Sequence, residues 1–179
     1  MKSIKHIALS AILTVSAFGA ITYTSCTKDE CKDVVCQNGG TCDAGVCTCP
    51  TGAGGTSCET VFRTTYANSY VGNGIDNGTP SFTYTNFKAT LSVIGTDITK
   101  MELVMKDNVG NALFTAPVVL SDTKTTGSVF TITSTTANGY TYTGTGNITS
   151  SNISTMTINQ KDNSNNSVLV LTFTNMAKQ

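Results

Sequence analysis

The chain has 179 residues, of which 12% are charged, and its 11 basic side chains balance its 11 acidic ones. Tryptophan is absent, and the single histidine, His6, lies in an N-terminal segment that we expect to be removed on export. A mature chain without histidine excludes Ser-His-Asp triads, histidine general bases and histidine-ligated zinc. The balanced charge argues against a nucleic-acid partner, which requires a clustered basic surface.

Residues 1–25 have the pattern of a secretory signal peptide. An apolar run of about 15 residues follows Lys2 and Lys5. A membrane-spanning helix is disfavoured, because it needs roughly 20 apolar residues. Two cleavage sites remain possible: one follows Ala17-Phe18-Gly19, and the other directly precedes Cys26.

The second cleavage site, Thr24-Ser25-Cys26, resembles the lipobox of bacterial lipoproteins, although Tyr23 stands where that pattern has an aliphatic residue. The six cysteines from Cys31 to Cys58 form a self-contained set, and lipidation accounts for the odd one, Cys26. The resemblance implies that Cys26 is acylated and that residues 26–30 form a short tether. Several acyl chains, such as palmitate, make such an anchor stable.

The residues after Cys26 indicate a location. Lys28-Asp29-Glu30 is similar to the signal that sends lipoproteins of the Bacteroidota to the outer face of the outer membrane. The resemblance implies a lipid-anchored protein of the bacterial outer membrane that is exposed at the cell surface. The alternative is that these three residues are only a solvated linker.

Residues 31–58 form a cysteine-rich module. Its apolar side chains are essentially Val34, Val35 and Val46, which are too few to offset the entropy of ordering the segment. We therefore expect disulfides to hold the module together, each contributing about 2–4 kcal/mol. Spacing alone leaves the cysteine pairing open.

The module resembles the EGF-like family in two motifs, Cys36-x-Asn-Gly-Gly-x-Cys42 and Cys47-x-Cys49-Pro-x-Gly-x-x-Gly-x-x-Cys58. Ala53 replaces the aromatic residue of the family, and Thr27 replaces the acid that its calcium-binding members require, so we expect no calcium. Zinc is disfavoured in an oxidising compartment, and no cofactor is expected. We expect a spacer more than a binding module. The resemblance implies the disulfides Cys31–Cys42, Cys36–Cys47 and Cys49–Cys58.

Residues 60–179 are rich in threonine, serine, asparagine and aliphatic residues, with the period-two alternation of strands that bury one face. Short turns such as Asn77-Gly78 and Asn138-Gly139 separate the strands, which favours antiparallel neighbours. The pattern predicts a mainly β domain of about eight strands, closed as a barrel or folded as a sandwich. The expected strands are 69–75, 82–93, 100–106, 112–120, 129–134, 140–148, 154–160 and 168–174.

Three features of this domain resemble the lipocalin-like domains of Bacteroidota lipoproteins: Tyr70-Val71-Gly72, residues 140–146 and the polar final hairpin. That resemblance favours a closed β-barrel. The chain departs from the lipocalin pattern because it has no tryptophan after the early glycine. Gly144 and Gly146 share one face of a strand, a pattern that can mark a tight bend at a barrel corner.

The carboxylates of this domain are its candidate catalytic groups, and they are few. A glycosidase needs two facing acids roughly 5–9 Å apart. Five of the acids fall in or beside predicted turns, where aspartate commonly caps its own backbone. Glu102 lies in the middle of a strand, on the face opposite Met101, Leu103 and Met105, and is expected to face solvent. The six acids are Asp76, Asp97, Glu102, Asp107, Asp122 and Asp162.

Two pairs of side chains are candidate ligand contacts. Tyr140 and Tyr142 lie at i and i+2 and would line a cavity or stack on sugar rings. Met101 and Met105 would line an adaptable apolar pocket. Ordinary core packing is the simpler interpretation of both pairs.

These observations predict a non-enzymatic envelope lipoprotein. An EGF-like spacer would present a β-domain that binds a small apolar or glycan ligand, or a surface protein. The alternatives are a carboxylate-dependent glycan hydrolase and a purely structural surface protein.

Overall fold

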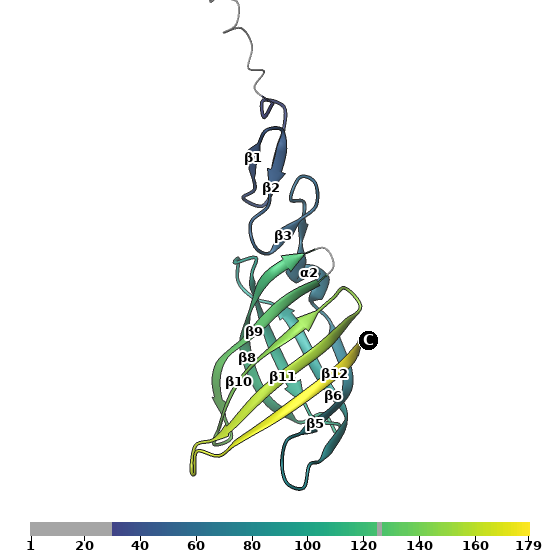
Figure 1. The fold of residues 1–179 in the computed structure, drawn as a ribbon, viewed down its shortest axis with the longest axis vertical. Helices are drawn as coiled ribbons and strands as arrows, with labels where there is room; N and C mark the ends of the chain where they lie inside the picture. The colour runs from purple at the N-terminus through teal and green to yellow at the C-terminus, as the bar shows by residue number, and fades with distance from the viewer. Residues whose placement is uncertain (1–29, 125–126) are drawn as a thin grey trace, which may run out of the picture.

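The computed structural model describes residues 30–124 and 127–179. The expected signal peptide and Cys26 lie outside the described residues. A small disulfide-rich region stands at one end of a β-barrel (Figure 1). We call the barrel end next to this region the proximal end and the opposite one the distal end.

The disulfide-rich region contains two short antiparallel ladders. Strand β1 (Thr41–Asp43) pairs with β2 (Val46–Thr48), and β3 (Ala53–Gly54) pairs with β4 (Thr60–Val61). Val35 and Val46 are exposed, so the region buries little apolar surface. The disulfides are Cys31–Cys42, Cys36–Cys47 and Cys49–Cys58, the same pairs that the EGF-like resemblance implies.

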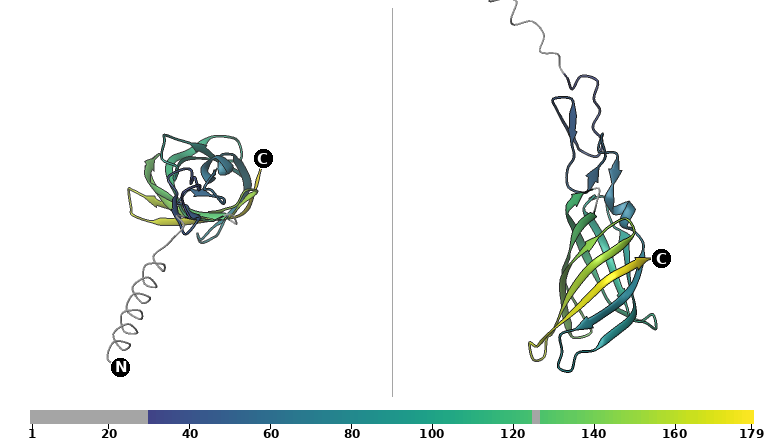
Figure 2. Two further views of the ribbon diagram at one scale, coloured as in Figure 1. Left: turned by 90° about the horizontal axis from the view of Figure 1, so that it is seen from above. Right: turned by 45° about the vertical axis from the view of Figure 1, so that its right-hand side comes forward.

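The second region is a closed eight-stranded antiparallel barrel. Successive strands are neighbours, and the barrel closes where the last strand, β12, pairs with the first, β5. The view along the barrel in Figure 2 (left) shows the ring of strands. The domain is therefore a closed barrel and not a sandwich. The strands are β5 (Ser69–Asp76), β6 (Thr83–Val93), β7 (Lys100–Lys106), β8 (Ala112–Lys124), β9 (Gly127–Ala137), β10 (Tyr140–Ile148), β11 (Asn152–Asp162) and β12 (Val168–Lys178).

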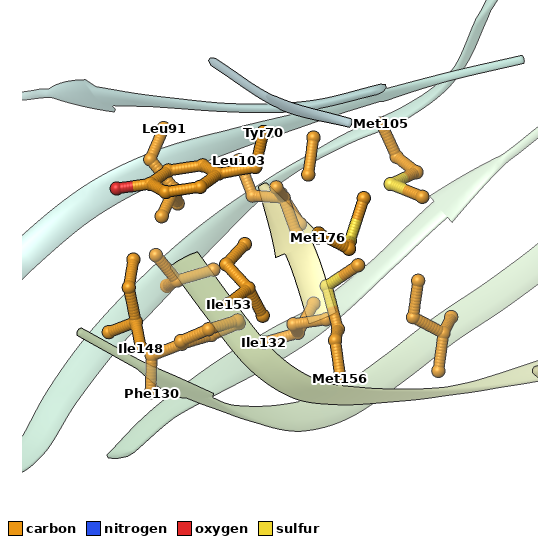
Figure 3. Packing of buried hydrophobic residues seen from close by; sticks show 14 of the residues in the cluster. Tyr70, Leu91, Leu103, Met105, Phe130, Ile132, Ile148, Ile153, Met156 and Met176 are labelled. Atoms are coloured by element: carbon orange, nitrogen blue, oxygen red, sulfur yellow. The ribbon is translucent and has the colours of Figure 1, made fainter. Parts of the chain in front are cut away.

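Side chains fill the interior of the barrel, which in an eight-stranded barrel is just wide enough to be filled by them or to hold one small ligand. Most inward residues of the strands are buried, and Figure 3 shows Phe130, Ile132, Ile153 and Met156 packed together. Glycines on the inner face make room for aromatic rings. A Cβ on Gly74 would lie 2.5 Å from the ring of Phe173.

A short helix, α2 (Phe62–Tyr66), packs at the proximal end, a feature that the sequence pattern did not predict. Phe62 and Tyr66 are buried in the barrel core, one helical turn apart. The Tyr66 hydroxyl lies 2.9 Å from the hydroxyl of Ser128, and the Tyr70 hydroxyl donates to the Tyr66 carbonyl at 2.9 Å. Burial raises the pKa of Tyr66, and burial together with the neighbouring Tyr66 raises the pKa of Tyr70 to about 12.

The two regions meet at a joint that includes Arg63. The Arg63 Nη1 donates to the carbonyls of Ile94 and Gly95 at 3.1 Å and of Asp97 at 2.7 Å, all in the loop between β6 and β7. The backbone amide of Phe62 donates to the carbonyl of Gly52 in the disulfide-rich region. These bonds connect the region, α2 and the barrel wall.

Candidate functional site

The described carboxylates of the barrel are dispersed, and most are engaged by their own turns. Asp97 accepts bonds from the amide and hydroxyl of Thr99, and Asp162 accepts the equivalent pair from Ser164. These bonds hold the pKa of Asp97 and of Asp162 below the usual value. Within residues 30–124 and 127–179, no group of three or more histidine, cysteine or acidic residues is placed to hold a metal ion.

The remaining acids give no catalytic pair either. Asp107 binds the amides of Val109 and Asn111 in its turn. Glu102 lies on the outer face of β7, where its cross-strand neighbours are Ser92 and Pro117. The side chain of Asp122 lies outside the described part of the chain.

Asp76 is the most buried of these acids, with 6% of its surface exposed. The hydroxyl of Tyr84 donates to its Oδ2 at 2.6 Å, and the amides of Gly78 and Phe82 donate to its Oδ1 at 3.0 Å. These bonds, first the one from Tyr84, lower the pKa of Asp76. The Asp76 carboxylate in turn raises the pKa of Tyr84 to about 12. Asp76 thus fixes the turn between β5 and β6 at the distal end.

The four candidate ligand contacts lie on the inner side of the barrel. Met101 and Met105 are 0% and 1% exposed and pack in the core. Tyr142 is buried, and its ring stacks on Phe114 with centroids 4.3 Å apart. Tyr140 is partly buried and lies nearer the distal end, with its ring centroid 6.4 Å from that of Tyr142. All four therefore contribute to packing.

A depression of about 240 Å³ lies in the outer wall of the barrel, where β12, β5 and β6 run side by side. Ile75 is one of its lining residues and has 51% of its surface exposed, and its register partners on the two neighbouring strands are Thr172 and Thr83. The volume is below the roughly 300–1,000 Å³ typical of clefts for drug-sized ligands. The depression lining consists of Asn73, Gly74, Ile75, Thr83, Thr172 and Thr174.

Local backbone geometry shapes this wall. The β5–β6 register shifts between Gly72 and Gly74, as it does at a β-bulge. Opposite the shift, Asn86 adopts a φ of 58°, in the left-handed region that asparagine tolerates. Its amide donates to the Oδ1 of Asn73 at 3.1 Å. This bond fixes Asn73 at the edge of the depression.

The depression continues into a wider array that we call the threonine patch, on the outer face of β10, β11, β12 and β5. Cross-strand pairing aligns its eight residues in two rows. The first row is Thr145, Thr157, Thr172 and Ile75, and the second is Asn147, Thr155, Thr174 and Asn73.

Sequence reasoning missed this site because its residues are brought together by barrel closure. Ile75 and Thr172 are neighbours only through the pairing of the first and last strands. The outward threonines were visible as polar positions of alternating strands. Alternation within one strand, however, does not show which residues lie beside each other on adjacent strands. The exposed Ile75 on a polar face was the one local signal.

Comparison of the chain with protein-family models, with curated proteins and with solved structures finds no match. No helix in the described part of the chain is both long and apolar enough to span a membrane. The chemistry of the site is that of uncharged hydroxyl and amide groups around one apolar side chain.

Proposed function

We propose that this chain is a non-enzymatic, lipid-anchored protein of the bacterial outer membrane, in which an EGF-like spacer presents a glycan-binding β-barrel at the cell surface. The EGF-like part of the proposal rests on the cysteine spacing and on the three disulfides between residues 31 and 58. Acylation of Cys26 would leave only four residues before Cys31, a tether of at most about 17 Å. The spacer would then raise the barrel from the membrane.

The eight strands form a closed meander, and this topology supports the proposed resemblance of the barrel to lipocalins. Lipocalins hold their ligand inside the barrel, however, and here side chains occupy the interior. The filled interior favours a binding surface on the outside. The described acids do not favour a hydrolase, because they are dispersed and most of them are bound in turns.

The observation that carries the binding proposal is the outer depression around Ile75. Its uncharged hydroxyl and amide side chains can exchange hydrogen bonds with sugar hydroxyls, because each hydroxyl both donates and accepts. The half-exposed Ile75 offers an apolar contact for the C–H face of a sugar ring. A volume of about 240 Å³ suits one ring-sized group. We therefore assign a neutral glycan to this depression.

A glycan array carrying neutral and acidic oligosaccharides tests the proposal with the full chain and with two variants. Ile75→Thr removes the apolar contact, while Val168→Thr makes an equivalent change at an outward position of β12 that is 52% exposed and does not line the depression. We expect binding of neutral glycans that Ile75→Thr weakens and Val168→Thr preserves. Absence of neutral glycan binding, or equal effects of the two variants, would contradict the proposal.

A further inference from the structure

We propose that the depression is one end of an extended site, and that the threonine patch binds a neutral oligosaccharide chain across β5, β12, β11 and β10. This inference rests on the proposed function and deepens it, because it specifies the length and charge of the glycan. It differs from the proposed function in assigning contacts to β10 and β11, which do not line the depression.

The dimensions of the patch support a ligand larger than a single sugar. Neighbouring strands lie about 4.8 Å apart, so a row from Ile75 to Thr145 spans three intervals, or about 14 Å. The two rows are two residues apart along each strand, a separation of about 7 Å. A monosaccharide in the depression would leave the part of the patch on β10 and β11 without a ligand.

The hydroxyls of the patch are available to an external ligand. Within the described part of the chain, the hydroxyls of Thr145, Thr157, Thr172 and Thr174 make no hydrogen bond. By contrast, the hydroxyl of Thr155 accepts a bond from the Nδ2 of Asn147 at 2.9 Å. Four hydroxyls that can each donate and accept therefore lie on three adjacent strands.

The charge of the patch determines the class of glycan. All eight of its residues are uncharged, and Ile75 is the only apolar one. An acidic polysaccharide would find no cation in the patch to pair with its carboxylates or sulfates. A neutral chain, which binds through hydroxyls and C–H faces, matches the side chains that are present.

The test compares chain lengths with substitutions that preserve strand structure. Threonine and valine have the same branched shape, so Thr157→Val removes a hydroxyl without removing β-propensity. Thr115→Val is the matched control, because Thr115 is an exposed outward residue of β8, on the far side of the barrel from β12. Calorimetric titration uses gluco-, manno- and galacto-oligosaccharides from monosaccharide to hexasaccharide. Thermal unfolding confirms that each variant is folded.

We expect tetrasaccharides of the bound series to bind more tightly than the monosaccharide. Thr157→Val should weaken tetrasaccharide binding roughly fivefold and leave monosaccharide binding unchanged. Thr115→Val should change neither. If binding is independent of chain length, or if Thr157→Val has no effect while Ile75→Thr still weakens binding, the extended site is refuted and the depression remains. If no series binds, or if acidic chains bind instead, both proposals are refuted.

Discussion

Gly146 on β10 lies directly opposite Phe130 on β9, and a Cβ on Gly146 would overlap the Phe130 ring. The glycine thus provides the space in which the ring packs. Gly74 and Phe173 repeat this relationship on β5 and β12, where they are also register partners. The pairs explain how a barrel of eight strands accommodates large aromatic side chains and why its interior leaves little room for a ligand.

Gly146→Ala should destabilise the barrel by about 1–3 kcal/mol, because an extra methyl group forces the Phe130 ring out of its packed position. Urea unfolding followed by circular dichroism measures this free energy. Thr145→Ala, on the outer face of the same strand, is the control and should change stability by less than about 1 kcal/mol. Similar stabilities for Gly146→Ala and the wild type would indicate that the interior is loosely packed.

Acid should destabilise the distal end through Asp76. Its pKa is lowered in the folded state, first by the hydrogen bond from Tyr84, so its stabilising contribution is complete above the unfolded pKa of about 3.9. The contribution is lost as pH falls through the lower, folded pKa. Asp76→Asn should therefore flatten the acid limb of stability against pH, as measured by urea unfolding from neutral pH to acid. An unchanged acid limb in this variant would contradict the assignment.

Reducing the disulfides should unfold the cysteine-rich region and leave the barrel folded. The region buries little apolar surface and depends on its cross-links, whereas the barrel core contains no cysteine. Amide hydrogen exchange with and without reductant measures the two regions separately. Loss of protection in β7 or β10 on reduction would show that the barrel depends on the disulfides.

Arg63→Met should loosen the joint between the two regions. The substitution keeps an apolar stem but removes the hydrogen bonds to the carbonyls of Ile94, Gly95 and Asp97, at a cost of about 1 kcal/mol. Hydrogen exchange in the loop of residues 94–99 should accelerate, while Thr64→Ala, on the same helix, should leave that loop unchanged. Unaltered hydrogen exchange in residues 94–99 of the Arg63→Met variant would show that the guanidinium does not hold this loop in place.

The sequence predicted the strands well where turn residues mark both ends. The bounds of β7 and β10 agree with the expected 100–106 and 140–148. Strands β11 and β12 extend further, because Asn152, Lys161 and Lys178 continue ladders that composition alone assigns to loops. The barrel, rather than the sandwich, follows from pairing between the first and last strands, which no local pattern contains.

Helix α2 and the outer depression were missed for physical reasons. Helix α2 has five residues, and the single i, i+4 pair of Phe62 and Tyr66 is too short a pattern to indicate an amphipathic helix. The depression depends on the lateral register of β5 against β12. The sequence instead predicted the tyrosine and methionine pairs as candidate ligand contacts. Periodicity identifies buried faces, but it does not distinguish a packed core from a ligand cavity.

We propose that the glycan binds on the outer wall of a filled barrel. The most direct measurement is a nuclear magnetic resonance titration of the isotope-labelled chain with the neutral oligosaccharide selected on the array. We predict that amide shifts change at Ile75, Thr172 and Thr174 while the methyl signals of Met101 and Met105 stay unchanged. Shifts at those core methionines without changes on β5 and β12 would place the ligand inside the barrel and contradict the account.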